Sequence, residues 1–227
     1  LVSVPRALTL AHLSRRQRKG YLALTQGLVA VAAGDATGAR RFAVRAEKFL
    51  NEPSLTLLLQ AQAAQLNGDE SAAERYFNAM LEKPGSSFLG LRGLLTQAMK
   101  KGDQSQALQL ARRARLLQPK AGWVLNALIE LEARNDNWEA ALTALGTAIR
   151  QGAVTPERGR KLRATLLIGQ SQQAEANGAP DESLRLARRA HEVSPSYAPA
   201  AIRYALLLVE SRQFRLAQKI VERSWKS

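Results

Sequence analysis

The 227-residue sequence contains no cysteine, which excludes disulfide bridges, thiolate metal sites and cysteine nucleophiles. Aromatic residues make up only 5% of the chain, and Ala, Leu, Gln and Arg are abundant, a composition that favours helices over sheets. No apolar run approaches the roughly 18 residues expected of a membrane span. The two histidines, His12 and His191, lie far apart in the chain, so the sequence offers no cluster of metal or haem ligands.

The sequence also lacks the residue groups that catalysis needs. The Ser and Thr residues have no nearby histidine base, no glycine-rich loop suited to phosphates appears, and most carboxylates stand where helices begin. We therefore predict that the protein is not an enzyme and carries no cofactor.

Charge of one sign predominates. The chain has 33 Lys and Arg against 19 Asp and Glu, a formal net charge of +14. Such an excess indicates an anionic partner, which is a nucleic acid, an acidic protein or a membrane surface with negative lipids. A basic surface that only keeps the protein soluble is the alternative.

A recurring stretch organises the chain. Gly-Asp is followed by an alanine five residues after the glycine, starting at Gly34, Gly68 and Gly102, each 34 residues after the last. Asn135 follows 33 residues later, and Gly178 and Arg212 are again 34 apart. A period of 34 residues is typical of the tetratricopeptide repeat, a pair of antiparallel helices that stacks on its neighbours.

Each recurring position has a physical role. Gly or Asn suits a left-handed residue at the end of a first helix, and the following Asp suits the start of a second helix. Small residues then recur at spacings of four and three, on one face of the second helix, and prolines come after it: Ala39, Ala43, Ala46; Ala107, Ala111, Ala114; Pro53, Pro84, Pro119, Pro195. The predicted fold is all-α, a tetratricopeptide-repeat (α-α) superhelix of about six helix hairpins.

Two segments depart from the repeat. Residues 1–19 have no repeat partner and are predicted to form a basic amino-terminal arm or helix before a solenoid of residues 20–227. An insertion occupies residues 151–163, where Thr155, Pro156 and Glu157 predict an early helix start and a first helix about two turns longer than the others. The insertion is either a binding feature or, as we favour, a simple lengthening of a loop.

The segment from Arg15 to Leu50 resembles the amino-terminal region of the bacterial HemY family. The basic cluster before Gly20-Tyr21, the run GLVAVAAGD and the following ARR with its spaced alanines carry the resemblance. HemY proteins are tetratricopeptide proteins associated with haem biosynthesis. An unrelated flavin-dependent protoporphyrinogen oxidase shares the name, but the Gly-x-Gly-x-x-Gly motif of flavin enzymes is missing here.

The resemblance implies an inner-membrane anchor upstream of this sequence and a supporting role for enzymes of late porphyrin and haem synthesis. The basic run beside that anchor would place the repeats on the cytoplasmic side, by the positive-inside tendency. The partners we expect are haem-biosynthesis enzymes and an anionic membrane surface. The residues expected to face that surface are basic: Arg15, Arg16, Arg18, Lys19, Arg40, Arg41, Arg112, Arg113, Arg188 and Arg189.

Solenoids of this kind usually bind partners on the concave face, which the first helices line. Repeat offsets give six polar candidates for a partner-binding groove: Gln62, Arg92, Thr96, Asn126, Gln172 and Arg203. Interspersed leucines would let the groove hold an extended peptide or a helix. We therefore predict a non-catalytic protein-binding scaffold. The alternatives are a helical-repeat protein that binds nucleic acid, disfavoured because stacking aromatics are scarce, and a haem or porphyrin carrier.

Overall fold

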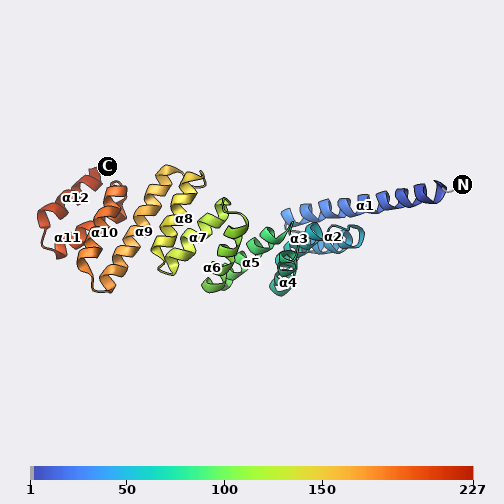
Figure 1. Cartoon of the computed structure of the whole chain (residues 1–227), viewed down its shortest axis with the longest axis horizontal. Helices are drawn as coiled ribbons and strands as arrows, with labels where there is room; N and C mark the ends of the chain where they lie inside the picture. Colours follow the sequence, from blue (N-terminus) through green and yellow to red (C-terminus); the bar gives the residue numbers. More distant parts are fainter. Residues whose placement is uncertain (1–2, 227) are drawn as a thin grey trace. The chain divides into compact units, whose positions relative to one another are not determined.

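The structure, a computed structural model, describes residues 3–226 and the side chains of residues 14–225. Residues 3–226 form twelve α-helices and no strand, paired in chain order into six hairpins (Figure 1). The first helices are α1 (Ser3–Ala32), α3 (Pro53–Leu66), α5 (Ser87–Lys101), α7 (Gly122–Arg134), α9 (Pro156–Ala176) and α11 (Ala198–Glu210). The second helices are α2 (Ala36–Phe49), α4 (Glu70–Leu81), α6 (Gln104–Leu117), α8 (Trp138–Arg150), α10 (Pro180–Val193) and α12 (Phe214–Lys226). The predicted all-α fold of tetratricopeptide hairpins is confirmed.

The contacts divide the hairpins into two compact units, residues 1–117 and residues 118–227. The amino-terminal unit contains α1 to α6, and the carboxy-terminal unit contains α7 to α12. Helix α1 runs unbroken across the boundary predicted between residues 19 and 20, so the basic segment and the first repeat helix are continuous. Gly20 lies inside this helix, where it is buried and packs directly against Leu50.

The turn inside each hairpin depends on one residue in the left-handed conformation. Gly34, Gly68, Gly102 and Gly178 all have φ between 72° and 74°. In the fourth hairpin this residue is Asp136, with φ 58°, and not Asn135 as predicted. Asp tolerates this conformation nearly as well as Asn, and the correction restores the spacing from Gly102 to a full 34 residues.

Aspartates begin the second helices of the amino-terminal unit. Asp35, Asp69 and Asp103 each accept a hydrogen bond from a backbone N–H three residues later, at 2.8–2.9 Å. The bond from the Ala72 amide, followed by that from the Ser71 hydroxyl, lowers the pKa of Asp69. Each cap satisfies a donor that the start of the helix would otherwise leave unpaired.

The small residues predicted for the second helices are buried. Ala39, Ala46, Ala107 and Ala114 are completely inaccessible to solvent, and Phe77 and Met80 fill the corresponding face of α4. Glycines on the first helices let these faces come close: a Cβ on Gly93 would lie 2.3 Å from the ring of Phe77. The small faces of the second helices are therefore buried, as the repeat pattern predicts. Large side chains of the first helices, such as Leu59, Leu91 and Leu125, fill the rest of the core.

Helix α9 begins at Pro156 and has 21 residues, whereas the other first helices of its unit have 13. Thr155 caps it by accepting a hydrogen bond from the Arg158 amide. The residue equivalent to the start of α11 is Ala164, so the additional turns of α9 are residues 156–163. These turns pack on α8, since Gly159 is buried and lies directly against Ile149.

Arg212 occupies the left-handed position of the last hairpin with φ 59°, where four other hairpins have glycine. We expect Arg212→Gly to stabilise the carboxy-terminal unit by up to about 1 kcal/mol. Glycine relieves the cost of about 1–2 kcal/mol of a left-handed non-glycine residue, but its greater unfolded-state entropy offsets part of this gain. Thermal unfolding followed by circular dichroism measures this. The neighbouring Ser211→Gly is the control, because Ser211 has φ −80° and should lose stability on the same substitution. A lower melting temperature for Arg212→Gly contradicts the prediction.

Candidate functional site

Three of the predicted groove residues lie on first helices of the amino-terminal unit. Gln62 on α3 and Thr96 on α5 are 34 residues apart and occupy equivalent positions, and Arg92 lies one turn before Thr96. Arg92 and Thr96 are exposed. Gln62 is half-buried, and its side-chain oxygen is buried without a hydrogen-bond partner in the described structure.

Exposed apolar side chains share this surface. On α5, Leu89 and Met99 lie one turn before Arg92 and one turn after Thr96. At the 34-residue repeat offset, Leu89 corresponds to Leu55 on α3 and to Tyr21 on α1. At the same offset, Gln62 corresponds to Leu28 on α1. All five apolar side chains are 40–46% exposed. We call these residues the first-helix stripe: Tyr21, Leu28, Leu55, Gln62, Leu89, Arg92, Thr96 and Met99. Sequence reasoning gave the polar members only, although a 34-residue offset from Gln62 leads to Leu28. Met99 has no apolar counterpart at this offset, where α3 has Gln65.

In the carboxy-terminal unit, the structure separates the three predicted groove residues. Asn126 on α7 and Gln172 on α9 are exposed, but only 13% of the Arg203 side chain on α11 is accessible. Arg203 stands 34 residues after Gly169, a position that faces the preceding hairpin, since a Cβ on Gly169 would lie 2.4 Å from the Trp138 ring. The helix register therefore points Arg203 into the repeat stack and away from a partner.

The guanidinium of Arg203 holds three helices together. Its Nε donates to the Ser171 hydroxyl at 3.1 Å, and one Nη donates to the Ser183 hydroxyl at 3.0 Å and to the Glu175 carboxylate. Ser171 and Glu175 belong to α9 and Ser183 to α10, and both serines are completely buried. Charge-assisted bonds of this kind satisfy the buried hydroxyls, so Arg203 serves the fold.

The predicted basic residues are exposed throughout. Arg15, Arg16, Arg18 and Lys19 lie on α1, where Arg16 donates a hydrogen bond to the Lys48 carbonyl oxygen at 3.1 Å. The others occupy second helices of both units: Arg40 and Arg41 on α2, Arg112 and Arg113 on α6, and Arg188 and Arg189 on α10. Arg41 lies over the Phe42 ring at 4.8 Å, and Arg188 pairs with Glu192 at 2.8 Å.

His191, considered above as a haem ligand, is half-buried at the end of α10. Burial lowers its pKa, with the Glu192 charge as a smaller opposing effect, and its ring lies 6.0 Å from that of Tyr204. The histidine is therefore biased toward the neutral form, which weakens any favourable interaction with the helix dipole. The His12 side chain lies outside the described side chains. Among the described residues, no three His, Asp or Glu side chains lie close enough together to hold a metal ion.

Two clefts of different chemistry lie away from the predicted groove residues. One, of about 550 Å³ between α2, α3 and α4, mixes Arg40 and Arg75 with Glu47 and Asp69. The other, of about 470 Å³ between α11 and α12, is lined mainly by Ile202, Leu206, Val209, Phe214 and Val221. In the preceding hairpin, formed by α9 and α10, the corresponding surface is covered by α11: Ala187 of α10 packs with Ala201 and Tyr204 of α11.

Comparison with known proteins shows what the chain resembles. Residues 1–68 match the family model described as the HemY protein N-terminus. The amino-terminal region is thus HemY-like. The match covers α1, α2 and α3 and confirms the resemblance inferred from Arg15 to Leu50.

A curated relative aligns with nearly the whole chain. Mms48, a probable magnetosome protein of Magnetospirillum gryphiswaldense, is 27% identical over 232 residues, covering 99% of this chain and 49% of the relative. The chain therefore spans about half the length of the curated relative it matches.

Solved structures share the fold. A crystal structure of MamA protein aligns with a TM-score of 0.53 at 16% identity, covering 78% of this chain and 92% of MamA. A MamA RS-1 ArsTM double mutant aligns at 0.50 and 12% identity, covering 78% and 94%.

At these identities, the alignments show a shared helical fold alone. Within residues 3–226, no helix combines the length and the apolar character needed to cross a bilayer.

The lowered pKa of His191 has a consequence for stability. Below its unfolded pKa of about 6.5, the unfolded chain binds more protons at this residue than the folded chain, so folded stability falls as the pH drops through that range. His191→Gln should lose less stability between pH 7.5 and pH 5.5 than the wild type, as measured by urea unfolding. The carboxylates titrate in both proteins and cancel in this comparison. Equal losses in the two proteins contradict the lowered pKa.

Proposed function

We propose that this protein is a non-catalytic scaffold that holds enzymes of porphyrin and haem biosynthesis at the inner membrane, with its repeats facing the cytoplasm. The HemY-like region, residues 1–68, supports the pathway and the membrane association. The tetratricopeptide hairpins support protein binding. We propose further that residues 1–19 lead from a membrane anchor into the repeats, which occupy residues 20–227 and include the extension around 151–163.

The observation that carries the proposal is the first-helix stripe. Three successive first helices present large apolar side chains to solvent at repeat-equivalent positions, with Arg92, Thr96 and Gln62 between them. Apolar anchors beside a few polar groups are typical of surfaces that bury a peptide or helix of another protein.

In the carboxy-terminal unit, we propose Asn126 and Gln172 as partner-binding residues in their own right, because they occupy exposed positions on first helices of that unit. Arg203 is not among them, since its donors are already bonded to Ser171, Ser183 and Glu175.

The basic residues supply the proposed contact with the membrane. Arg15, Arg16, Arg18 and Lys19 concentrate four positive charges within five residues of α1. Each basic residue near an anionic leaflet contributes about 1 kcal/mol of attraction, so such a cluster favours the cytoplasmic face. The exposed arginines of α2, α6 and α10 extend this preference over the second helices.

The double substitution Leu89→Asp/Met99→Asp tests the stripe. It places two charges among side chains that a partner would bury, so partner capture should fall about tenfold or more. Wild-type and variant proteins would be used as bait with detergent-solubilised native membranes, and captured porphyrin-pathway enzymes would be quantified by mass spectrometry.

The matched control is Leu116→Asp/Leu117→Asp, which adds the same two charges at apolar side chains of α6 that are 83% and 51% exposed and lie outside the stripe. This variant should capture partners as well as the wild type. Undiminished capture by the stripe variant contradicts the stripe as the binding surface. The absence of porphyrin-pathway enzymes from the wild-type capture contradicts the haem assignment.

A further inference from the structure

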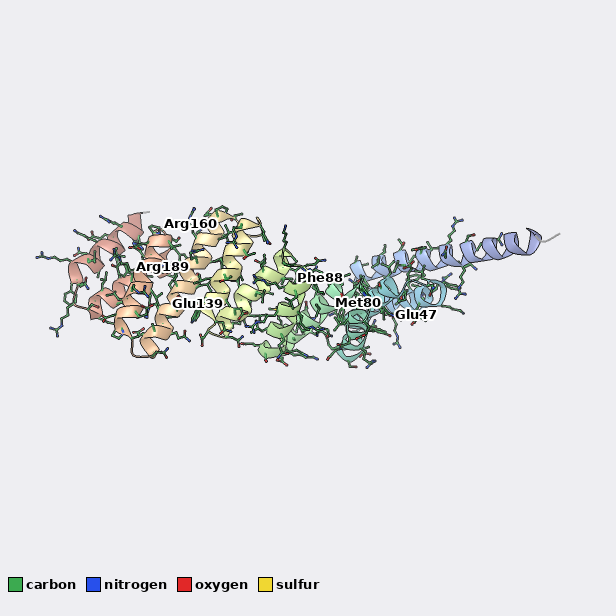
Figure 2. The ribbon with its side chains drawn as sticks, in the orientation of Figure 1. Glu47, Met80, Phe88, Glu139, Arg160 and Arg189 are labelled. Carbon is green, nitrogen blue, oxygen red and sulfur yellow. The ribbon has the colours of Figure 1, made fainter. Side chains whose placement is uncertain are left out.

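Three arginines line one cleft in the carboxy-terminal unit. Arg150 at the end of α8, Arg163 on α9 and Arg189 on α10 surround a space of about 350 Å³ whose apolar wall includes Leu142 and Leu167. In Figure 2, Arg189 is labelled on α10, and Arg160 is labelled on α9 one turn before Arg163. Consecutive second helices and the first helix between them therefore bring positive charge to one place.

Among the described residues that line this cleft, none is acidic. Within the described part of the chain, Arg163 and Arg189 have neither an ion pair nor a hydrogen bond, and Arg150 donates one hydrogen bond to Thr147 at 3.1 Å. Most of the guanidinium N–H groups thus remain available to a ligand. The mutual repulsion of three nearby cations is also left uncompensated.

Several neighbouring basic residues are instead paired with acids of their own helix. On α10, Arg185 pairs with Glu182 at 2.6 Å and Arg188 pairs with Glu192 at 2.8 Å. On α9, Lys161 pairs with Glu157 at 3.0 Å. These acidic residues balance basic side chains of their own helix and none of them lines the cleft.

The corresponding groove of the amino-terminal unit is electrically balanced. It too lies between two second helices and the first helix between them, but its Arg40 and Arg75 are accompanied by Glu47 and Asp69. The repeat architecture therefore provides the groove in both units, and the surplus of positive charge is specific to the carboxy-terminal one.

The additional turns of α9 contribute the third arginine. Gly159 packs against Ile149 of α8, and Arg163 lies four residues further along, on the same face of α9. Arg150 directly follows Ile149. The extension thus brings Arg163 toward Arg150, which gives residues 156–163 a role in binding and not only in loop length.

We propose that this cleft binds a phosphoryl group, carried either by a lipid headgroup or by a soluble phosphate compound. Guanidinium groups recognise phosphate through paired N–H donors. Arginines from three helices surround a multiply charged tetrahedral anion better than a carboxylate, which one arginine can satisfy alone. The site is independent of the first-helix stripe and does not rest on the proposed scaffold function.

The test titrates the 227-residue chain with pyrophosphate at constant ionic strength, using isothermal calorimetry. The wild type should bind at one saturable site, and Arg163→Gln/Arg189→Gln should weaken the binding about tenfold or more. Without pyrophosphate, the double variant should melt no lower than the wild type, since the substitution relieves repulsion and breaks no pair.

The control is Arg185→Gln/Arg188→Gln. It removes the same total of two positive charges, but at arginines of α10 that are already paired with acids. It should bind pyrophosphate like the wild type. Equal weakening in both double variants, or no saturable binding by the wild type, overturns the proposal.

Vesicles of phosphatidylcholine with and without phosphatidic acid separate the two sources of the phosphoryl group. If a lipid is the source, Arg163→Gln/Arg189→Gln loses binding to the acidic vesicles about tenfold and the control variant does not. If the source is soluble, the two variants bind vesicles equally and differ only toward pyrophosphate.

Discussion

The close approach of helix faces built from small side chains is the constraint on which the rest of the structure depends. Ala39, Ala107 and Ala187 are completely buried on their second helices, and glycines such as Gly93 meet the neighbouring helix without a side chain between them. Because a hairpin cannot bury such a face alone, it has to stack on the next one. The stacking uses the faces between helices and leaves the outward faces of the helices free to carry function.

The repeat chemistry made most of the fold predictable. The left-handed glycines, the aspartate caps and the start of α9 at Pro156 are all local features, so the residues that encode them are close together in the sequence. The fourth turn was misplaced by one residue because Asn135 and Asp136 are both suited to a left-handed turn, and only the backbone shows which one adopts it.

The surfaces were less predictable because a helix turns by about 100° per residue, so an error of one position moves a side chain to another face. Arg203 is the example. It was predicted for the groove, but the exposed residue is its neighbour Ile202, which is 56% accessible. Arg203 itself lies against Ser171 and Ser183. Conversely, the sequence analysis did not name the apolar residues Leu89 and Met99 for the groove, yet both are exposed on α5 beside Arg92 and Thr96. The division into two compact units has no composition signal around residues 117 and 118 that we can identify.

Two arginines of the carboxy-terminal unit show how context decides what a cation does in this fold. Arg203 is held by Glu175 and two buried hydroxyls, so its charge is neutralised within the stack and stabilises it. Arg163 lies on the same helix as Glu175 but three turns earlier, in the added segment, where no acid faces it. A net charge of +14 therefore does not act as a uniform coat. Part of it is consumed by ion pairs along the helices. The rest is distributed over several helices and includes Arg163, which the insertion placed in a cleft without a described acid.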